Sequence, residues 1–92
     1  MLQIKRSLNG GVVFTLVGRI EIEHVPELQR LLRLEEGDDR IAFDLQDVTL
    51  IDRDAVKFLA GCEADTIRLD NCPAYLRVWI DREKKRTSAR KT

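Results

Sequence analysis

The sequence holds few of the residues from which catalytic or metal sites are built. It has one histidine, His24, and two cysteines, Cys62 and Cys72, which are too far apart for a CxxC pair. These are too few ligands for a protein-bound zinc ion, and His24 stands at a predicted helix start, where capping the helix or facing solvent is its simpler role. No serine or cysteine has a neighbouring base that would activate it, and no glycine-rich phosphate loop is present. We therefore expect a protein that is not an enzyme and holds neither a cofactor nor a metal ion.

Long apolar runs are also absent. No stretch approaches the roughly 20 apolar residues of a membrane-spanning helix, and the first residues lack the basic-then-apolar order of a signal peptide. The cysteine content falls short of the disulfide framework that stabilises small secreted domains. These absences favour a cytoplasmic protein without a membrane span.

Charged residues, by contrast, are abundant and unevenly distributed. They make up 35% of the chain, although the formal net charge is zero. Residues 1–81 carry ten basic and fifteen acidic side chains, whereas residues 82–92 carry six basic side chains and one acidic one. Because apolar residues almost vanish after residue 81, we expect a folded domain over 1–81 and a basic, disordered tail over 82–92.

The basic tail leaves an alternative function open. Lysine and arginine side chains neutralise the phosphates of DNA or RNA, which would make the chain a nucleic-acid-associated accessory protein. However, the tail has no aromatic residue to stack on bases, and a solvated tail that aids solubility is the simpler interpretation.

The order of apolar patterns predicts a single small α/β domain. Short β-prone runs at 4–8 and 12–17 flank Asn9-Gly10, a residue pair typical of a tight β-hairpin. The elements expected after the hairpin are a helix over 25–35, a strand over 40–45, a helix from 53, a strand over 66–69 and a last helix from 73. Strands that alternate with helices pair in parallel, so we expect a mostly parallel sheet of about four strands with about three helices.

Two details of this prediction concern burial. The run over 12–17 is almost entirely apolar, which is expected of a strand that is covered on both faces, and Gly18 is expected to end it. Helical spacing in the last helix predicts its buried side. That side is expected to consist of Tyr75, Leu76, Trp79 and Ile80.

The most informative segment lies where the apolar run 48–51 meets the next helix. Asp52, Arg53 and Asp54 stand at this point, which is called the junction below. Asp52 fits a helix N-cap, whose carboxylate accepts hydrogen bonds from the free N–H groups of the first turn. Asp54 either supports the same helix through its dipole or belongs to an exposed recognition surface, as loops at the carboxyl ends of such strands commonly do.

Three segments follow one another in an order that matches a known pattern. Residues 16–21 (LVGRIE) are similar to a Leu-x-Gly-x-Leu-Asp strand ending. Residues 43–52 (FDLQDVTLID) are similar to a strand that leads into an Asp-Ser-Ser-Gly-Leu motif, and residues 69–73 (LDNCP) to a short strand before a third helix. On these segments the chain resembles the STAS domain family, the anti-sigma factor antagonists of bacteria.

The chain also departs from the family at the junction. Residues 52–56 (DRDAV) replace Asp-Ser-Ser-Gly-Leu, and Asp54 stands where the family has the serine that a partner kinase phosphorylates. A carboxylate is not a substrate for a serine kinase, and its fixed charge is smaller than that of phosphoserine. Glu21 matches the family's acidic residue near that serine. The chain therefore resembles a shortened STAS variant, without the final strand and helix of many members.

The resemblance implies a non-catalytic protein-interaction module in bacterial signalling and transcription regulation. Its partner would be an anti-sigma factor of the serine-kinase type, another STAS protein or a second copy of the chain. The implied contact residues are Glu21, Asp52, Arg53 and Asp54. Phosphorylation at the usual position is not expected, and Thr49, the only hydroxyl residue near the junction, is expected to be buried.

Overall fold

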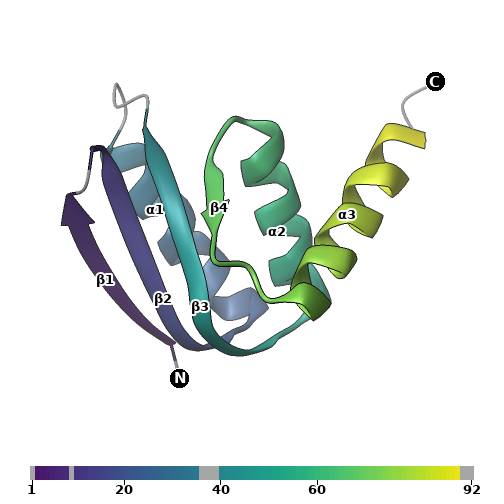
Figure 1. The fold of residues 1–92 in the computed structure, drawn as a ribbon, viewed down its shortest axis with the longest axis horizontal. Coiled ribbons are helices and arrows are strands. Elements are labelled where there is room, and N and C mark those ends of the chain that lie inside the picture. Colours follow the sequence, from purple (N-terminus) through teal and green to yellow (C-terminus); the bar gives the residue numbers. More distant parts are fainter. Residues whose placement is uncertain (1, 9, 36–39, 90–92) are drawn as a thin grey trace.

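A four-stranded mixed sheet organises the chain (Figure 1). The computed structural model describes residues 2–8, 10–35 and 40–89, with side chains described as far as residue 85. In chain order the elements are β1 (Leu2–Leu8), β2 (Val12–Ile20), the 3₁₀ turn η1 (Ile22–His24), α1 (Val25–Leu34), β3 (Ile41–Ile51), α2 (Arg53–Ala64), β4 (Arg68–Asp70) and α3 (Ala74–Ala89). The strand order is β1-β2-β3-β4, with β1 antiparallel to β2 and the other neighbours parallel. The predicted α/β fold class, with its hairpin and mostly parallel sheet, is confirmed.

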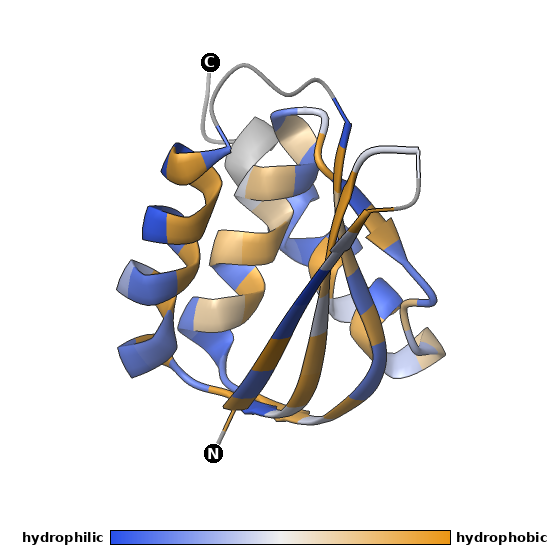
Figure 2. Ribbon diagram, turned by 90° about the vertical axis from the view of Figure 1, so that its left-hand side faces the viewer, coloured by the Kyte–Doolittle hydropathy of each residue, from blue (hydrophilic) through white to orange (hydrophobic). Residues whose placement is uncertain are grey.

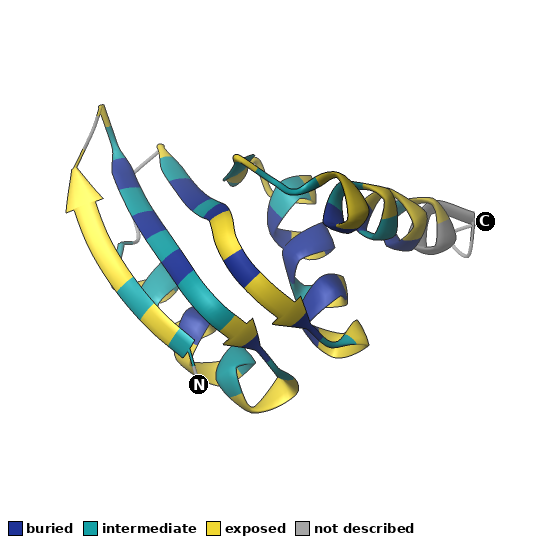
Figure 3. Ribbon diagram, turned by 60° about the horizontal axis from the view of Figure 1, so that its bottom comes forward, coloured by how far each residue is buried: buried dark blue, intermediate teal, exposed yellow. Residues whose placement is uncertain are grey.

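One face of the sheet is covered more completely than the other. Along β2 the even-numbered residues from Val12 to Leu16 are buried, whereas the odd-numbered residues from Val13 to Val17 are half-buried (Figure 3). The buried row belongs to a core to which β3, α1 and α2 also contribute, and α1 and α2 lie side by side (Figure 2). The prediction that β2 is covered on both faces is therefore wrong, because this alternation is typical of a strand with one open face.

β2 does not end at Gly18, as predicted, but continues to Ile20. Gly18 has a φ of 104°, an angle that glycine adopts without the steric cost of a Cβ atom. The register with β3 shifts between Gly18 and Arg19, opposite an extra residue of β3, Thr49. The strand therefore bends here instead of stopping, and β2 and β3 end level, with Ile20 opposite Ile51.

α3 extends well beyond the predicted end of the folded domain. The helix continues to Ala89, so residues 82–89 are helical where a disordered tail was expected, while residues 90–92 lie outside the described residues. Packing explains the extension: Glu83 is only 5% exposed, and the Lys84 ammonium lies 2.9 Å from a carboxylate oxygen of Glu63 in α2. Tertiary contacts thus stabilise a helix that its polar composition alone would leave marginal.

The buried side of α3 is narrower than predicted. Leu76 and Ile80 are fully buried, as expected, and Trp79 is half-buried. Tyr75 was expected in this row but is 53% exposed, and its hydroxyl lies 3.4 Å from the carbonyl oxygen of Val48 in β3.

Across the described ranges, no helix has both the length and the apolar character needed to cross a membrane.

Candidate protein-interaction site

The junction lies at the edge of the sheet where β2 and β3 both end. The backbone N–H of Asp52 donates to the Ile20 carbonyl oxygen at 3.1 Å. Because neighbouring parallel strands present their carboxyl ends at the same edge, η1 starts beside α2. The structure thereby brings Glu21, which follows β2, next to Asp52, which follows β3.

Asp52 is a structural residue that joins two elements. Its Oδ1 atom accepts a hydrogen bond from the Ala55 N–H at 2.9 Å, which confirms the predicted N-cap of α2. Its Oδ2 atom accepts from the Ile22 N–H at 2.8 Å, at the start of η1. Both carboxylate oxygens are engaged by backbone donors from segments far apart in the sequence, so the side chain holds η1 against α2.

Arg53 pairs with α3. Its Nε atom lies 3.7 Å from Oε2 of Glu83, whose side chain is 6% exposed against 56% for that of Arg53. A buried carboxylate is costly unless an opposite charge compensates it, so Arg53 contributes to the placement of α3. Sequence reasoning missed this contact because Glu83 was assigned to a disordered tail.

Asp54 is the junction residue whose charge is left to solvent. It is exposed in the first turn of α2, and within the described part of the chain its carboxylate has neither a hydrogen-bond nor an ion-pair partner. Asp52 already supplies the cap, so Asp54 supports the helix only through the dipole, worth about 0.3–1 kcal/mol. Of the two roles expected for Asp54, exposure favours recognition.

Two apolar side chains that sequence reasoning did not single out border the junction. Ile22 is 56% exposed and Leu50 is 53% exposed. An apolar centre with a charged rim is the usual composition of a protein-binding surface. The sequence signals for these residues are weak: Ile22 comes two positions after Ile20, the last buried residue of β2, and Leu50 stands inside the apolar run 48–51, just before the buried Ile51. The whole set is called the candidate surface below: Glu21, Ile22, Leu50, Arg53 and Asp54.

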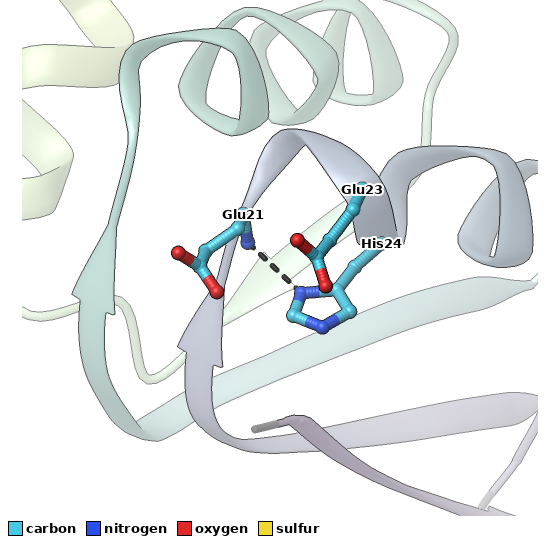
Figure 4. Close-up of side chains that lie close together, drawn as sticks. All are labelled: Glu21, Glu23 and His24. Carbon is cyan, nitrogen blue, oxygen red and sulfur yellow. Dashed lines mark hydrogen bonds between the residues drawn. The ribbon is translucent and has the colours of Figure 1, made fainter.

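Glu21 also belongs to a small titratable cluster with Glu23 and His24 (Figure 4), whose ligand atoms all lie within 4.8 Å of one another. The His24 Nδ1 atom accepts a hydrogen bond from the Glu21 backbone N–H at 3.0 Å. His24 therefore takes part in the capping box of η1, whereas it was expected to cap the helix that follows, α1, to which its side chain makes no cap bond. The hydrogen bond from Glu21 engages the Nδ1 lone pair and, in the neutral ring, leaves the proton on Nε2. A metal ion would have to break the bond to gain a ring nitrogen, so the cluster is better described as a capping turn.

Thr49 is exposed, and the prediction that it is buried is wrong. The physical reason is the bulge: the register of β2 and β3 passes from Val48 to Leu50, which leaves Thr49 as the extra residue without a partner on β2. A bulge changes the direction in which a side chain points and disrupts the local ladder. A hydroxyl is therefore accessible close to the junction.

The cysteines are not poised for nucleophilic chemistry. Cys62 is 5% exposed, and burial, together with the charge of Asp65, raises the pKa of its thiol to about 12. Burial also raises the pKa of the Cys72 thiol. Since the thiolate is the reactive form, both side chains are held in the unreactive state near neutral pH.

The hairpin, the parallel pairs and the helix order define an α/β fold of the STAS type. A solved structure of the anti-sigma factor antagonist SpoIIAA in its unphosphorylated form matches the chain with a TM-score of 0.64 and 16% identity, over 100% of both chains. A protein of the DUF3478 family with a SpoIIAA-like fold, from Shewanella loihica PV-4, matches with a TM-score of 0.49 and 15% identity, over 71% of this chain and 56% of the other. No protein-family model and no curated protein sequence matches the chain.

Proposed function

We propose that this chain is a non-catalytic regulatory module that works by binding another protein through the candidate surface. The observation that carries the proposal is the exposure of Asp54, a charge without a partner among the described residues. It stands at the position where the resembled family places its phosphorylated serine. The likeness in fold to an anti-sigma factor antagonist supports the same class of function.

The composition of the candidate surface supports protein binding rather than catalysis. Ile22 and Leu50 offer apolar area that a partner would cover, and Asp54 offers a charge that would select the partner's orientation. The Cys62 thiol is buried and the Cys72 thiol half-buried, burial raises the pKa of both, and His24 is engaged in capping, so none of these three side chains is set up for general base or nucleophilic chemistry.

The partner we propose is an anti-sigma factor of the serine-kinase type or another STAS protein, with a second copy of the chain as a further candidate. Regulation by phosphorylation at the usual position is lost, because Asp54 is a carboxylate. Its charge is permanent but smaller than that of phosphoserine, so the module has one fixed state at this position.

Binding to purified serine-kinase anti-sigma factors of the source organism, measured by isothermal titration calorimetry, tests the proposal. The double change Arg53→Ala plus Asp54→Ala should weaken binding by about tenfold or more, because it removes both charges of the candidate surface on α2. The matched control is Asp65→Ala plus Lys85→Ala, which removes one acid and one base at exposed positions elsewhere and should leave the affinity unchanged.

Incubation of the chain with each of these anti-sigma factors and ATP tests whether regulation by phosphorylation is lost. No phosphate should be incorporated into the wild type near the junction. Labelling that disappears in Thr49→Val would show that the exposed threonine has taken over the switch and would overturn the loss of regulation. In the calorimetric experiment, equal binding of the partner by the double variant and by the wild type would place recognition on another surface.

A further inference from the structure

A groove on the helical side of the molecule lies apart from the candidate surface. It runs between α1 and α2, which lie side by side (Figure 2), and it has a volume of about 460 Å³. Sites for small molecules are typically clefts of about 300–1,000 Å³ with mostly apolar linings and a few polar groups. The groove shares no residue with the candidate surface, so it needs a separate explanation.

Half-buried side chains supply the apolar part of the groove's lining, and a glycine leaves room in it. Leu32 of α1, Phe58 of α2 and Ile67 before β4 contribute apolar surface. Gly61 lies on the α2 wall, and a Cβ atom added there would meet no other atom within 4 Å. Glycine in a helix costs about 1 kcal/mol relative to alanine, so this residue keeps space open at a cost in helix stability.

Two cations stand on facing walls of the groove. Arg33 comes from α1 and Lys57 from α2, and both are exposed. Within the described residues, neither has an ion-pair partner, in contrast to Arg30, whose guanidinium lies 3.0 Å from Glu27 on the same helix. The lining also contains one acidic residue, Asp65. Because it faces two basic residues, the groove keeps a net positive charge.

We propose that the groove binds a small amphipathic anion, with its apolar body against Leu32, Phe58 and Ile67 and its anionic head between Arg33 and Lys57. A neutral apolar ligand would contact the apolar side chains but leave both cations without a counter-charge. A free inorganic anion would use the cations but leave the apolar lining in water. Only a molecule with both parts satisfies both features of the groove.

Decanoate is a suitable probe because it combines an alkyl chain with a single carboxylate. Titration of the full chain with decanoate, followed by ¹⁵N heteronuclear NMR, should shift the amide signals of Leu32, Lys57, Gly61 and Ile67 in a saturable manner. The matched neutral probe is decanol, which should bind at least about threefold more weakly, because it lacks the charge that meets the two cations.

Gly61→Leu is the variant that should abolish binding. It fills the groove from the α2 wall and should raise the dissociation constant for decanoate more than about tenfold. Since a side chain at this position meets open space and leucine favours the helix more than glycine does, the variant should fold, which its melting temperature will verify.

Lys57→Ala should raise the dissociation constant by about threefold, and Lys85→Ala, an exposed lysine on α3, is its control and should leave it unchanged. Equal binding by a folded Gly61→Leu variant, or shifts that map to the open face of the sheet, would overturn the site. Equal affinity for decanoate and decanol would overturn the anionic head. None of these measurements involves a protein partner, so a result that overturns the groove as a binding site would leave the proposed function unaffected.

Discussion

α2 carries charged residues at both of its ends, and the two ends satisfy them in different ways. At the C-terminal end, Glu63 accepts hydrogen bonds from Arg77 at 2.8 Å and from Lys84 at 2.9 Å, both on α3. At the N-terminal end, Asp52 is engaged by backbone N–H groups, whereas Asp54 is exposed and has no partner in the described ranges. The C-terminal end of α2 is joined to α3 by ion pairs, whereas the N-terminal end has a carboxylate that is exposed to solvent.

This difference separates charge that holds the fold from charge that is available for recognition. A partner that approached Glu63 would have to compete with two cations, whose hydrogen bonds, led by that of Arg77, lower the pKa of the carboxyl to about 2. A partner that approached Asp54 would displace only water. Recognition is therefore expected at the N-terminal end of α2 rather than at its C-terminal end.

The largest effect is expected from Asp52→Ala, which tests how far the N-terminal end is also structural. The change leaves the N–H groups of Ala55 and Ile22 without their acceptors and should lower the free energy of unfolding by about 2 kcal/mol. Urea denaturation followed by circular dichroism measures it. Asp52→Asn retains one acceptor oxygen and should lose about half as much.

A second prediction concerns the C-terminal end. Glu63→Gln should lower the free energy of unfolding by about 1 kcal/mol at neutral pH, because it removes the charge that Arg77 and Lys84 share. The folded-state pKa of Glu63, about 2, lies below the ordinary value of 4.5. The stabilisation is therefore complete above pH 4.5 and is lost as the pH falls toward 2.

Denaturation of the wild type and of Glu63→Gln over the acidic range checks this pH dependence. Their stabilities should differ above pH 4.5 and converge toward pH 2. Asp65→Asn, an exposed carboxylate just past the end of α2, serves as control and should follow the wild type throughout. A stability difference that does not change with pH would mean that Glu63 acts through packing rather than through its charge.

Sequence reasoning succeeded where the signal is local. The hairpin follows from a turn pair, and the cap by Asp52 follows from the residue type at the start of an apolar helix. These features depend on residues within a few positions of one another. The exposure of Arg53 and Asp54 follows for the same reason, because β3 ends where α2 begins.

The rest depends on contacts between distant segments. The buried Glu83 and its pairing with Arg53 could not be read from a segment whose composition is typical of disorder, and the exposure of Thr49 follows from a bulge in the pairing of β2 with β3. The groove beside Gly61 exists only because α1 and α2 are neighbours. Composition describes each segment alone, whereas packing decides which side chains a neighbour covers.

The smallest effect on stability, and the sharpest test of the comparison, is expected from Asp54→Ala. Because Asp54 contributes only through the helix dipole, the free energy of unfolding should fall by only about 0.3–1 kcal/mol, while affinity for a protein partner should fall by about tenfold. Asp54→Asn keeps the shape and removes the charge, so an equal loss of affinity in both variants would show that the partner reads charge. If Asp54→Ala instead destabilises the protein as much as Asp52→Ala and the folded fraction still binds, Asp54 belongs to the fold, and both ends of α2 use their charge in the same way.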